Sequence, residues 1–384
     1  MIRKICVVVT ARASYSRVRT LLQAIAQHPC LELQLVIAAS ALLEKYGSLS
    51  QSIRKDAFAI TAKVSNALDS ENATAAAKTT GLGTIELASV FENIRPDIVV
   101  TIADRFETMS TAIAAAFMNI PLAHIQGGEM TGNIDDKVRH AVTQLADIHF
   151  AATRMATARI IKMGQQPETV YHTGCPSIDQ VFEVFVDPRI DFDPFHLYGG
   201  VGRTFDLSKP YLMVMQHPVT TEPENARQQI KQTFDAIHAL NIPTLWFWPN
   251  ADPGTSEIAG GIRTFREHHE NLPIHFFKNT EPIHFLKLLK NTACLIGNSS
   301  AGIREGGCLG TPVVNIGSRQ LGRERGSNVM DATPEKDSIL NAVHQQLAKG
   351  NYAQNHMYGD GNAGRKIAAL LATVPLTFHK QLSY

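Results

Sequence analysis

Residues 5–27 read ICVVVTARASYSRVRTLLQAIAQ. The first five residues are apolar and mostly β-branched, which is typical of a strand that is buried on both faces. A turn of small and polar residues follows, and apolar side chains then recur at helical spacing from Val18 to Ile25. A strand, a short turn and a helix in this order predict the first unit of a parallel sheet with a crossover helix.

The same rhythm recurs in both halves of the chain. Predicted strands are residues 33–38, 98–102, 122–125, 148–152, 211–215, 244–248, 274–277, 294–296 and 312–316. Predicted helices are residues 16–27, 106–118, 224–240, 257–267, 283–291, a segment from about residue 300, and residues 364–372. Between residues 187 and 210 the rhythm stops, because prolines, glycines and scattered aromatics show no period there.

Two successive halves with this pattern favour an α/β fold of two Rossmann-like, doubly wound domains. We place the N-terminal domain at residues 1–187 and the C-terminal domain at residues 205–363, and a helix within residues 364–384 can pack on either half. In open parallel sheets, ligands bind beyond the carboxyl ends of the strands. If the two domains face each other across a cleft, the residues just after the strands line the site.

Length and composition exclude several classes of protein. A chain of 384 residues exceeds one ordinary core, and 44% hydrophobic with 18% charged residues are typical of a soluble globular protein. With a formal net charge of +1, nothing in the whole-protein charge argues for a nucleic-acid or membrane surface, so we expect neither partner, and the longest apolar runs are far short of a membrane span. No signal-peptide cleavage site follows the N-terminal apolar run, so we expect a cytoplasmic protein.

The cysteines are scattered along the chain. They are Cys6, Cys30, Cys175, Cys294 and Cys308, and they form no CxxC pair. Several lie in apolar, strand-like segments. We therefore expect buried free thiols, and neither a disulfide framework nor a metal site.

The turn after the first predicted strand contains Arg12 and Ser16. Small residues let the backbone turn, and the amide groups at the start of the next helix favour an anion. Arg12 can add a charge-assisted contact. The alternative is an ordinary helix cap with a surface arginine.

Two further segments in the first half are rich in ionisable residues. Asp104 and Arg105 follow a predicted strand, where they either place charges beside a substrate or simply pair and cap the next helix. Residues 124–136, HIQGGEMTGNIDD, hold three glycines and three carboxylates after the next strand. Crowding raises the pKa values of some carboxylates, which suits general acid–base chemistry at neutral pH, although a solvated loop is the alternative. The candidates here are Asp104, Arg105, Glu129, Asp135, Asp136 and His140.

Polar side chains also follow the predicted strands of the second half. Residues 297–305, GNSSAGIRE, place a small-residue turn between a strand and a helix N-terminus, which suits a diphosphate. This turn is neither a P-loop nor a GxGxxG fingerprint, so an ATPase or a dehydrogenase is poorly supported. The loop around Arg319 either supplies positive charge to a ligand or is simply solvated. The candidates are His217, Asn250, Ser299, Ser300, Glu305 and Arg319.

Together these segments resemble the hydrolysing branch of the UDP-N-acetylglucosamine 2-epimerases, which includes bacterial sialic-acid pathway enzymes and the epimerase half of the animal epimerase/kinase. The resemblance extends over nearly the whole chain. The shared blocks are residues 12–16 (RASYS), 104–106 (DRF), 127–129 (GGE), 134–136 (IDD), 216–220 (QHPVT), 297–300 (GNSS), 310–315 (GTPVVN) and 358–362 (YGDGN).

The resemblance implies a glycosyltransferase-B-like pair of domains, with the last helix crossing back to the first domain. It also implies a homodimer or homotetramer, no nicotinamide cofactor and no metal in the chemistry. In such enzymes a base removes the proton at C2 and UDP leaves C1, which gives a 2-acetamidoglycal. Addition of water with reprotonation at C2 then gives free N-acetylmannosamine, so a UDP-sugar is the substrate and UDP is a product.

Carried over residue by residue, the resemblance implies roles for the candidates. Asp104 and Asp135 match acidic catalytic positions, with Arg105 beside the ligand. Arg12 and Ser16 would contact the diphosphate. The residues that would complete the UDP pocket are His217, Asn250, Ser299, Ser300, Glu305 and Arg319.

Two positions depart from the family pattern. Well-studied members have His-Ile-Glu where this chain has His-Ile-Gln, and the side chain of Gln126 cannot ionise. Either Glu129 or Asp135 carries the proton transfer instead, or Gln126 is an engineered substitution that impairs catalysis. Ser14 stands where some relatives have aspartate, which indicates a different substituent on the sugar.

Four alternatives stay open. The same chemistry can act on a diacetamido-trideoxy sugar, or a non-hydrolysing enzyme can return an intact UDP-sugar. A glycosyltransferase of the same architecture would need an acceptor, and the carboxylates within residues 129–136 argue against it. A nucleotide-sugar-binding protein without turnover is suggested only by Gln126.

Overall fold

The computed structural model describes residues 2–43, 49–68, 72–132, 134–219, 222–249, 254–269, 271–377, 380–381 and 383. The chain forms two units. Unit 1 consists of Met1–Met130, Ile134–Gln180 and Met357–Tyr384, and unit 2 consists of Thr131–Asn133 and Val181–His356. None of the helices within the described ranges is long and apolar enough to cross a membrane.

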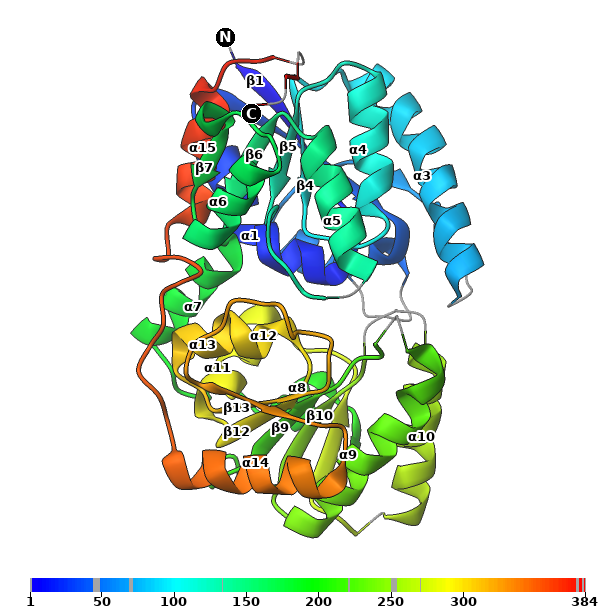
Figure 1. Ribbon diagram of the computed structural model, residues 1–384, viewed down its shortest axis with the longest axis vertical. Helices are drawn as coiled ribbons and strands as arrows, with labels where there is room; N and C mark the ends of the chain where they lie inside the picture. The colour runs from blue at the N-terminus through cyan, green and yellow to red at the C-terminus, as the bar shows by residue number, and fades with distance from the viewer. Residues whose placement is uncertain are drawn as a thin grey trace. The chain divides into compact units, whose positions relative to one another are not determined.

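Unit 1 alternates strands and helices from its N-terminus (Figure 1). Its strands are β1 (Arg3–Val9), β2 (Leu31–Ala38), β3 (Ile60–Val64), β4 (Ile98–Ile102), β5 (Leu122–Ile125), β6 (Ile148–Ala151) and β7 (Val170–His172). Its helices are α1 (Arg12–Gln27), α2 (Leu49–Lys55), α3 (Ala73–Ile94), α4 (Thr108–Phe117), α5 (Ile134–Leu145), α6 (Arg154–Lys162), the first part of α7 (Pro176–Val186) and α15 (Ala363–Thr373). The strands form one parallel sheet in the order β3-β2-β1-β4-β5-β6-β7, so the strand order reverses between β1 and β4.

Helices cover both faces of this sheet because β1 sends alternate side chains into two cores. Ile5 and Val7 are buried with apolar residues of α1 and α15. Cys6 and Val8 are buried with apolar residues of α3 and α4. An apolar strand with helices on both sides is the arrangement that the run at residues 5–9 predicts.

The last helix, α15, is part of the core of unit 1. Ile367 and Leu371 are buried in the same cluster as the apolar face of α1. The Asp179 carboxylate accepts hydrogen bonds from the backbone amides of Ala363, at 2.9 Å, and Gly364, at 2.7 Å. These two bonds cap the N-terminus of α15 and hold the helix against the unit.

Unit 2 contains a second sheet. Its strands are β8 (Val201–Gly202), β9 (Leu212–Met215), β10 (Thr244–Phe247), β11 (Ile274–Phe277), β12 (Cys294–Gly297), β13 (Val313–Ile316) and β14 (Val329–Ala332). Its helices are α8 (Pro194–Tyr198), α9 (Ala226–Leu240), α10 (Thr255–His268), α11 (Pro282–Asn291), α12 (Ser300–Ile303), α13 (Glu305–Leu309) and α14 (Lys336–Lys349). The strand order is β14-β13-β12-β9-β10-β11-β8, so the direction of the order reverses between β9 and β12. The strand β8, at one end of the sheet, pairs antiparallel with β11.

The two sheets confirm the predicted α/β class, but the chain divides at other places than predicted. The predicted domains were residues 1–187 and 205–363, whereas the units divide after Gln180 and again before Met357. Residues 188–204 were expected to lie between domains, yet they contribute α8 and β8 to unit 2. Phe195 of α8 packs its ring against Phe205 and Phe277. Aromatic packing of this kind leaves no period in the sequence, which is why the pattern missed it.

Candidate active site

The backbone turns sharply after three strands of unit 1. Ala39 follows β2 with φ of 49°, Ala103 follows β4 with φ of 70°, and Gln126 follows β5 with φ of 66°. Residues with a Cβ rarely adopt this left-handed conformation, so packing must hold all three positions in it. Strained residues cluster at functional sites, and these three lie at the carboxyl edge where a doubly wound sheet binds ligands.

Arg139, on α5, is the centre of the polar network at this edge. Its Nη2 donates to the Asp104 carboxylate, and its Nη1 donates to the Asp136 carboxylate and to the backbone oxygen of Glu129, the last at 2.8 Å. The structure thus gathers Asp104, Glu129 and Asp136, all predicted site residues, around a cation that the sequence analysis did not select. The available signal was the spacing of Asp136 and Arg139, which places them on one face of a helix.

The acids around Arg139 outnumber the guanidinium. Burial by itself would lower the pKa of Arg139, but the charges of Asp104, Glu129 and Asp136 outweigh burial and raise that pKa above its ordinary value. Like charges that crowd together shift the pKa values of carboxylates, which suits general acid–base chemistry.

His124, on β5, is fully buried beside this cluster. Its Nε2 faces the Ala103 oxygen at 2.9 Å, and its Nδ1 faces the Thr143 hydroxyl at 3.1 Å. A carbonyl oxygen only accepts, so Nε2 carries the proton and donates. Burial lowers the pKa of His124 to about 4. The neutral imidazole therefore fixes the strained Ala103 turn next to Asp104.

We expect this histidine to make unit 1 less stable in mild acid. Its pKa in the folded chain, about 4, lies below the ordinary value of 6.5, so the unfolded chain binds the proton first. The stability that the neutral ring contributes is present above pH 6.5 and is lost as pH falls towards 4. Between pH 7 and pH 5 we expect about 2 kcal/mol of unfolding free energy to be lost in the wild type and retained in His124→Gln. Urea unfolding followed by circular dichroism at both pH values measures this difference, and equal losses in the two proteins would contradict it.

Arg105 is held within its own segment. It donates to both carboxylate oxygens of Glu107, at 3.1 Å each, and Glu107 also accepts a hydrogen bond from the Ser40 hydroxyl at 3.0 Å. Glu107 is buried, and the Arg105 guanidinium lies 5.7 Å from the centre of the Phe106 ring. Asp104 and Arg105 thus bond to different partners, Arg139 and Glu107.

Gly127 and Gly128 let the loop after β5 lie against its neighbours. At Gly128, with φ of 73°, a Cβ would lie 2.5 Å from the Ala156 backbone oxygen of α6. Arg159 of α6 donates a hydrogen bond to the Gly128 oxygen. A side chain at either glycine would displace the loop that carries Glu129, because a Cβ on Gly127 would lie 2.9 Å from the Thr143 hydroxyl.

Gln126, where the chain departs from the family pattern, is fully buried. Its Nε2 donates to the Cys175 sulfur at 2.9 Å, and that sulfur lies 3.0 Å from the Ser177 hydroxyl. Its Oε1 has no hydrogen-bond partner among the described residues. The Gln126 side chain is therefore held by the thiol of Cys175, a residue for which the sequence predicted no role in the site.

The other candidates of unit 1 lie at the starts of two helices. α1 begins at Arg12, four residues before the predicted start, because the turn after β1 is shorter than expected. Burial lowers the pKa of Arg12 to about 10, so it stays a cation at neutral pH. The Ser16 backbone oxygen accepts a hydrogen bond from Gln180 at 2.5 Å. Asp135 lies in the first turn of α5, and burial and then Arg139 lower the pKa of His140 on the same helix.

In unit 2, His217 and Asn298 connect the two strands at the reversal of strand order. The His217 amide donates to Asn298 Oδ1 at 2.8 Å, and Asn298 Nδ2 donates to the His217 oxygen at 2.9 Å. The side chain of Asn298 carries both a donor and an acceptor, so one residue can bridge the loops after β9 and β12. His217 was predicted as a site residue from the sequence, whereas Asn298 was not.

The helix predicted from about residue 300 is divided in two. Ser299 caps α12, with its hydroxyl accepting from the Ala301 amide at 3.3 Å, and Ser300 is the first residue of that helix. Arg304, with ψ of −72°, separates α12 from α13. Glu305 therefore begins α13, whereas the sequence predicts one helix that starts at about residue 300. Glycines at residues 302, 306 and 307 weaken a continuous helix here.

The basic loop after β13 is anchored to Asn298. Arg319 and Gln320 both donate to the Asn298 backbone oxygen, at 3.1 Å and 3.2 Å, and Arg323 donates to Gln320 Oε1 at 2.7 Å. This loop is therefore an ordered part of the same edge as His217. The remaining candidate of this unit, Asn250, lies outside the described residues.

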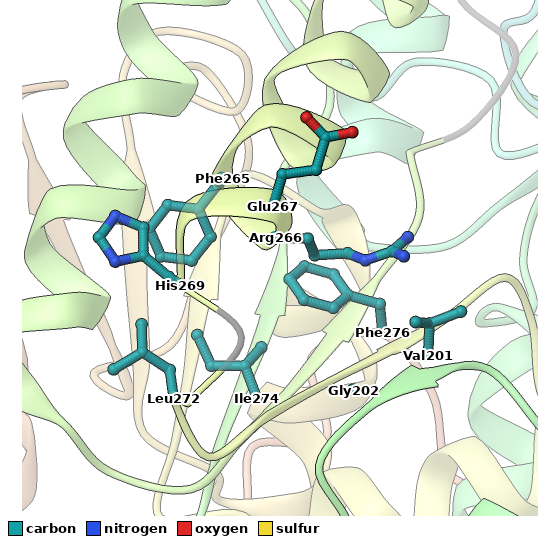
Figure 2. Close-up of a pocket in the computed structure, with 9 residues that line it drawn as sticks. All are labelled: Val201, Gly202, Phe265, Arg266, Glu267, His269, Leu272, Ile274 and Phe276. Atoms are coloured by element: carbon teal, nitrogen blue, oxygen red, sulfur yellow. The ribbon is translucent and has the colours of Figure 1, made fainter.

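A cavity of about 210 Å³ lies at one end of the sheet of unit 2, beside β8 and β11, whereas His217 and Asn298 follow the central strands β9 and β12 (Figure 2). It is lined by Val201, Gly202, Phe265, Arg266, Glu267, His269, Leu272, Ile274 and Phe276. No predicted site residue is among them. We therefore assign this cavity no part in the candidate site.

The described ranges hold no group of three or more histidine, cysteine, aspartate or glutamate side chains that could bind a metal ion. All five cysteines are free thiols, as expected, and all except the exposed Cys30 are buried.

The chain is similar to known proteins over almost its full length. A family model described as UDP-N-acetylglucosamine 2-epimerase matches residues 23–372. A protein of Legionella pneumophila named UDP-N,N'-diacetylbacillosamine 2-epimerase (hydrolyzing) is 33% identical over 382 residues, which cover 100% of this chain and 98% of the relative. A UDP-N-acetylglucosamine 2-epimerase of Neisseria meningitidis serogroup B is 28% identical over 362 residues, covering 94% of this chain and 92% of the relative.

A solved structure supports the fold. The crystal structure of the UDP-GlcNAc 2-epimerase from Neisseria meningitidis, bound to UDP-GlcNAc, aligns with a TM-score of 0.78 and 17% identity, covering 96% of this chain and 99% of that chain. Enzymes of this kind have the glycosyltransferase-B-like fold, so the predicted fold class is confirmed.

Proposed function

Because the chain belongs to the UDP-N-acetylglucosamine 2-epimerase family, we propose that it is a hydrolysing 2-epimerase that acts on a UDP-activated 2-acetamido sugar. The reaction consumes one water molecule. A base takes the proton from C2, and the bond between C1 and the diphosphate oxygen breaks, which releases UDP and a 2-acetamidoglycal. Water then adds its hydroxyl group to C1 while C2 gains a proton on the opposite face. The products are UDP and the free sugar with inverted C2.

The observation that carries this proposal is the cluster of acids around Arg139. Removing a proton from carbon and returning it to the other face needs more than one acid–base group. Asp104 and Asp136 are both bound to the guanidinium, and the backbone of Glu129 is bound to it as well. Asp104 is our candidate for the base at C2, because its ion pair favours the carboxylate form.

The second acid–base group must be chosen among the neighbouring carboxylates. Gln126 has no ionisable group, so we assign it no proton transfer. Asp135 lies in the first turn of α5, next to Asp136, and Glu129 lies in the loop before that helix. We assign the return of the proton to Asp135 and leave Glu129 as its alternative. Asp136, Arg105 and His140 complete the sugar site in this proposal.

The departing UDP needs cations and N–H donors. In unit 2 we assign UDP binding to the loops after β9, β12 and β13. Asn298 connects them, because it accepts hydrogen bonds from the His217 amide and from Arg319. Ser299, Ser300 and Glu305, at the starts of α12 and α13, complete that pocket together with Asn250. In unit 1, Arg12 and Ser16 at the start of α1 supply positive charge and helix amide groups.

The relatives favour one sugar over another. The Legionella pneumophila relative, named for UDP-N,N'-diacetylbacillosamine, is 33% identical over the whole chain, and the Neisseria meningitidis relative, named for UDP-N-acetylglucosamine, is 28% identical. Ser14, which stands where some relatives have aspartate, is buried in the first turn of α1. We therefore propose the diacetamido-trideoxy sugar as the better substrate, with UDP-N-acetylglucosamine as the second candidate.

Proton NMR in deuterated water tests the reaction. We expect the purified protein, mixed with either UDP-sugar, to release UDP and a free sugar that is epimerised and deuterated at C2. The initial rate should be higher with UDP-N,N'-diacetylbacillosamine. An intact UDP-sugar epimer as the product would overturn the hydrolytic step, and turnover only in the presence of an acceptor would identify a transferase.

The variant Gln126→Glu serves as the control for an impaired site. If the glutamine is the natural partner of Cys175, the added charge should lower turnover, because a buried carboxylate would face a thiol. If the wild type shows no turnover and Gln126→Glu does, then Gln126 is the residue that impairs the wild-type site.

A further inference from the structure

Arg139 joins three separate segments of unit 1 with one side chain. Its guanidinium reaches Asp104 after β4, the Glu129 backbone oxygen in the loop after β5, and Asp136 in the first turn of α5. A guanidinium is planar and its N–H groups point in fixed directions, so it holds its acceptors at defined angles. The orientation of Asp104 is therefore set by a residue on another element.

The exposure of these side chains shows which of them can meet a ligand. The Arg139 side chain is 1% exposed, whereas those of Asp104 and Asp136 are 12% and 18% exposed. Solvent reaches the carboxylates but scarcely reaches the guanidinium that binds them. Arg139 can therefore act on a substrate only through its partners.

Stability alone does not account for this arrangement. Taking an ion pair out of water costs roughly as much as the attraction returns, and a third acid, Glu129, adds repulsion. A buried cluster with surplus negative charge at a strand edge is instead typical of a functional site.

We propose that Arg139 is a positioning residue that aims the Asp104 carboxylate at the substrate and keeps it ionised over the working pH range. This inference rests on the proposed function, in which Asp104 accepts the proton from C2. Arg139 itself contacts no reacting atom.

The direction of the pH effect follows from the charges that surround Asp104. The acids are Asp104, Glu129 and Asp136, and Arg139 is the cation among them. The other groups on adjoining elements are neutral His124 on β5, Asp135 and His140 on α5, the Arg105–Glu107 pair, and Arg159 on α6. Removing the charge of Arg139 leaves mutual repulsion among three acids, so Asp104 should take up a proton at higher pH.

Two substitutions separate charge from geometry. Arg139→Met removes both the charge and the hydrogen bonds. Arg139→Lys keeps the charge, but a single ammonium cannot span Asp104, Asp136 and the Glu129 oxygen with the geometry of a guanidinium. Arg19→Lys is the matched control, because Arg19 also makes a two-pronged pair with a carboxylate, at 2.6 Å and 2.8 Å to Asp56, in the same unit.

Steady-state kinetics from pH 5 to pH 9 give the decisive readout. For Arg139→Met we expect kcat to fall at least about 100-fold, KM to change less than about threefold, and the acidic limb of the kcat profile to move up by about one pH unit. For Arg139→Lys we expect the acidic limb to stay at the wild-type pH while kcat falls about tenfold. Arg19→Lys should stay within about threefold of wild type at every pH.

Other results overturn the proposal. A kcat of Arg139→Met within about tenfold of wild type would do so, and so would an unmoved acidic limb. If Arg139→Met does not fold, Arg139→Lys decides, and a lysine variant whose acidic limb has moved up contradicts the charge role.

Failure of the proposed function is recognised separately. A wild-type protein that turns over neither UDP-sugar refutes the reaction, whatever the variants do. The Asp104 carboxyl can still be titrated by carbon NMR in protein labelled with 13C-aspartate, with its signal assigned through Asp104→Asn. Arg139 keeps its role only if Asp104 titrates at higher pH in Arg139→Met than in the wild type.

Discussion

Replacing Asp104 by asparagine is expected to lower kcat for UDP release at least about 100-fold, the usual scale for a general base. Asparagine has nearly the same shape and can still accept a hydrogen bond from Arg139, so the fold should persist. It cannot take the proton from C2. UDP affinity should change less than about threefold, because the substitution removes no group that we assign to the diphosphate. Deuterium incorporation at C2 and UDP release should fall together.

Asp97 provides the matched control for this substitution. Asp97 is the residue before β4, whereas Asp104 is the second residue after that strand. The Asp97 carboxylate accepts a hydrogen bond from the Lys4 backbone amide at 2.8 Å. Asp97→Asn keeps an acceptor there and should leave kcat near the wild-type value. Near-normal turnover in Asp104→Asn would remove Asp104 from the mechanism and would leave Asp135 and Glu129 as the candidates.

Replacing Gly297 by alanine is expected to destabilise unit 2 by about 3 kcal/mol or more. Gly297 ends β12 with φ of 133°, a conformation that L side chains rarely adopt. A Cβ there would lie 2.0 Å from the Met215 backbone oxygen on the neighbouring strand, so the two strands would have to separate. Their loops carry His217 and Asn298, and UDP affinity should fall along with stability.

Urea unfolding followed by tryptophan fluorescence measures this loss, because both tryptophans of the chain, Trp246 and Trp248, lie in unit 2. The matched control is Gly260→Ala, inside α10 of the same unit, where an added Cβ meets no atom within 4 Å. That variant should be more stable by roughly 0.5–1 kcal/mol, since alanine favours a helix over glycine. Unchanged stability in Gly297→Ala would show that β9 and β12 tolerate separation.

Strands that are buried on both faces were predicted best. Residues 98–102, 122–125 and 274–277 were predicted with the bounds that β4, β5 and β11 have in the structure. Such strands consist mostly of apolar residues, with a single threonine or histidine in each of these three, and they are short and bounded by turn residues. β3, at one end of the first sheet, was missed because its side chains alternate in exposure and polar residues interrupt the run.

Helices with few large apolar residues were also missed. α3 is the longest helix among the described elements, yet alanine, threonine and glycine make up much of its sequence. Small side chains let α3 pack closely on α4, where a Cβ on Gly83 would collide with Ser110. Close packing of this kind depends on the partner helix and leaves no strong period in the sequence.

Only part of the candidate site could be predicted from the sequence, because the burial of a charged residue depends on the elements that pack around it. Acids that directly follow strands can be found from the sequence, and Asp104 was found in this way. Arg139 lies within a helix, where a charged residue is ordinarily solvated, so only the fold reveals that it is buried. Ser299 illustrates the opposite limit, because a hydroxyl at a helix start can cap the helix or bind a ligand, and the structure gives it a capping bond.

Unit 1 is built from stretches near both ends of the chain, which affects the order in which the two units can fold during synthesis. The apolar face of α1 is completed by α15, which lies near the other end of the chain. A ribosome therefore releases α1 long before its packing partner exists. The Val181–His356 segment of unit 2 is continuous and can close its own sheet during that interval. During synthesis, unit 2 can therefore fold before unit 1 is complete. A chain that stalls before Met357 would contain a folded unit 2 and a unit 1 that lacks α15.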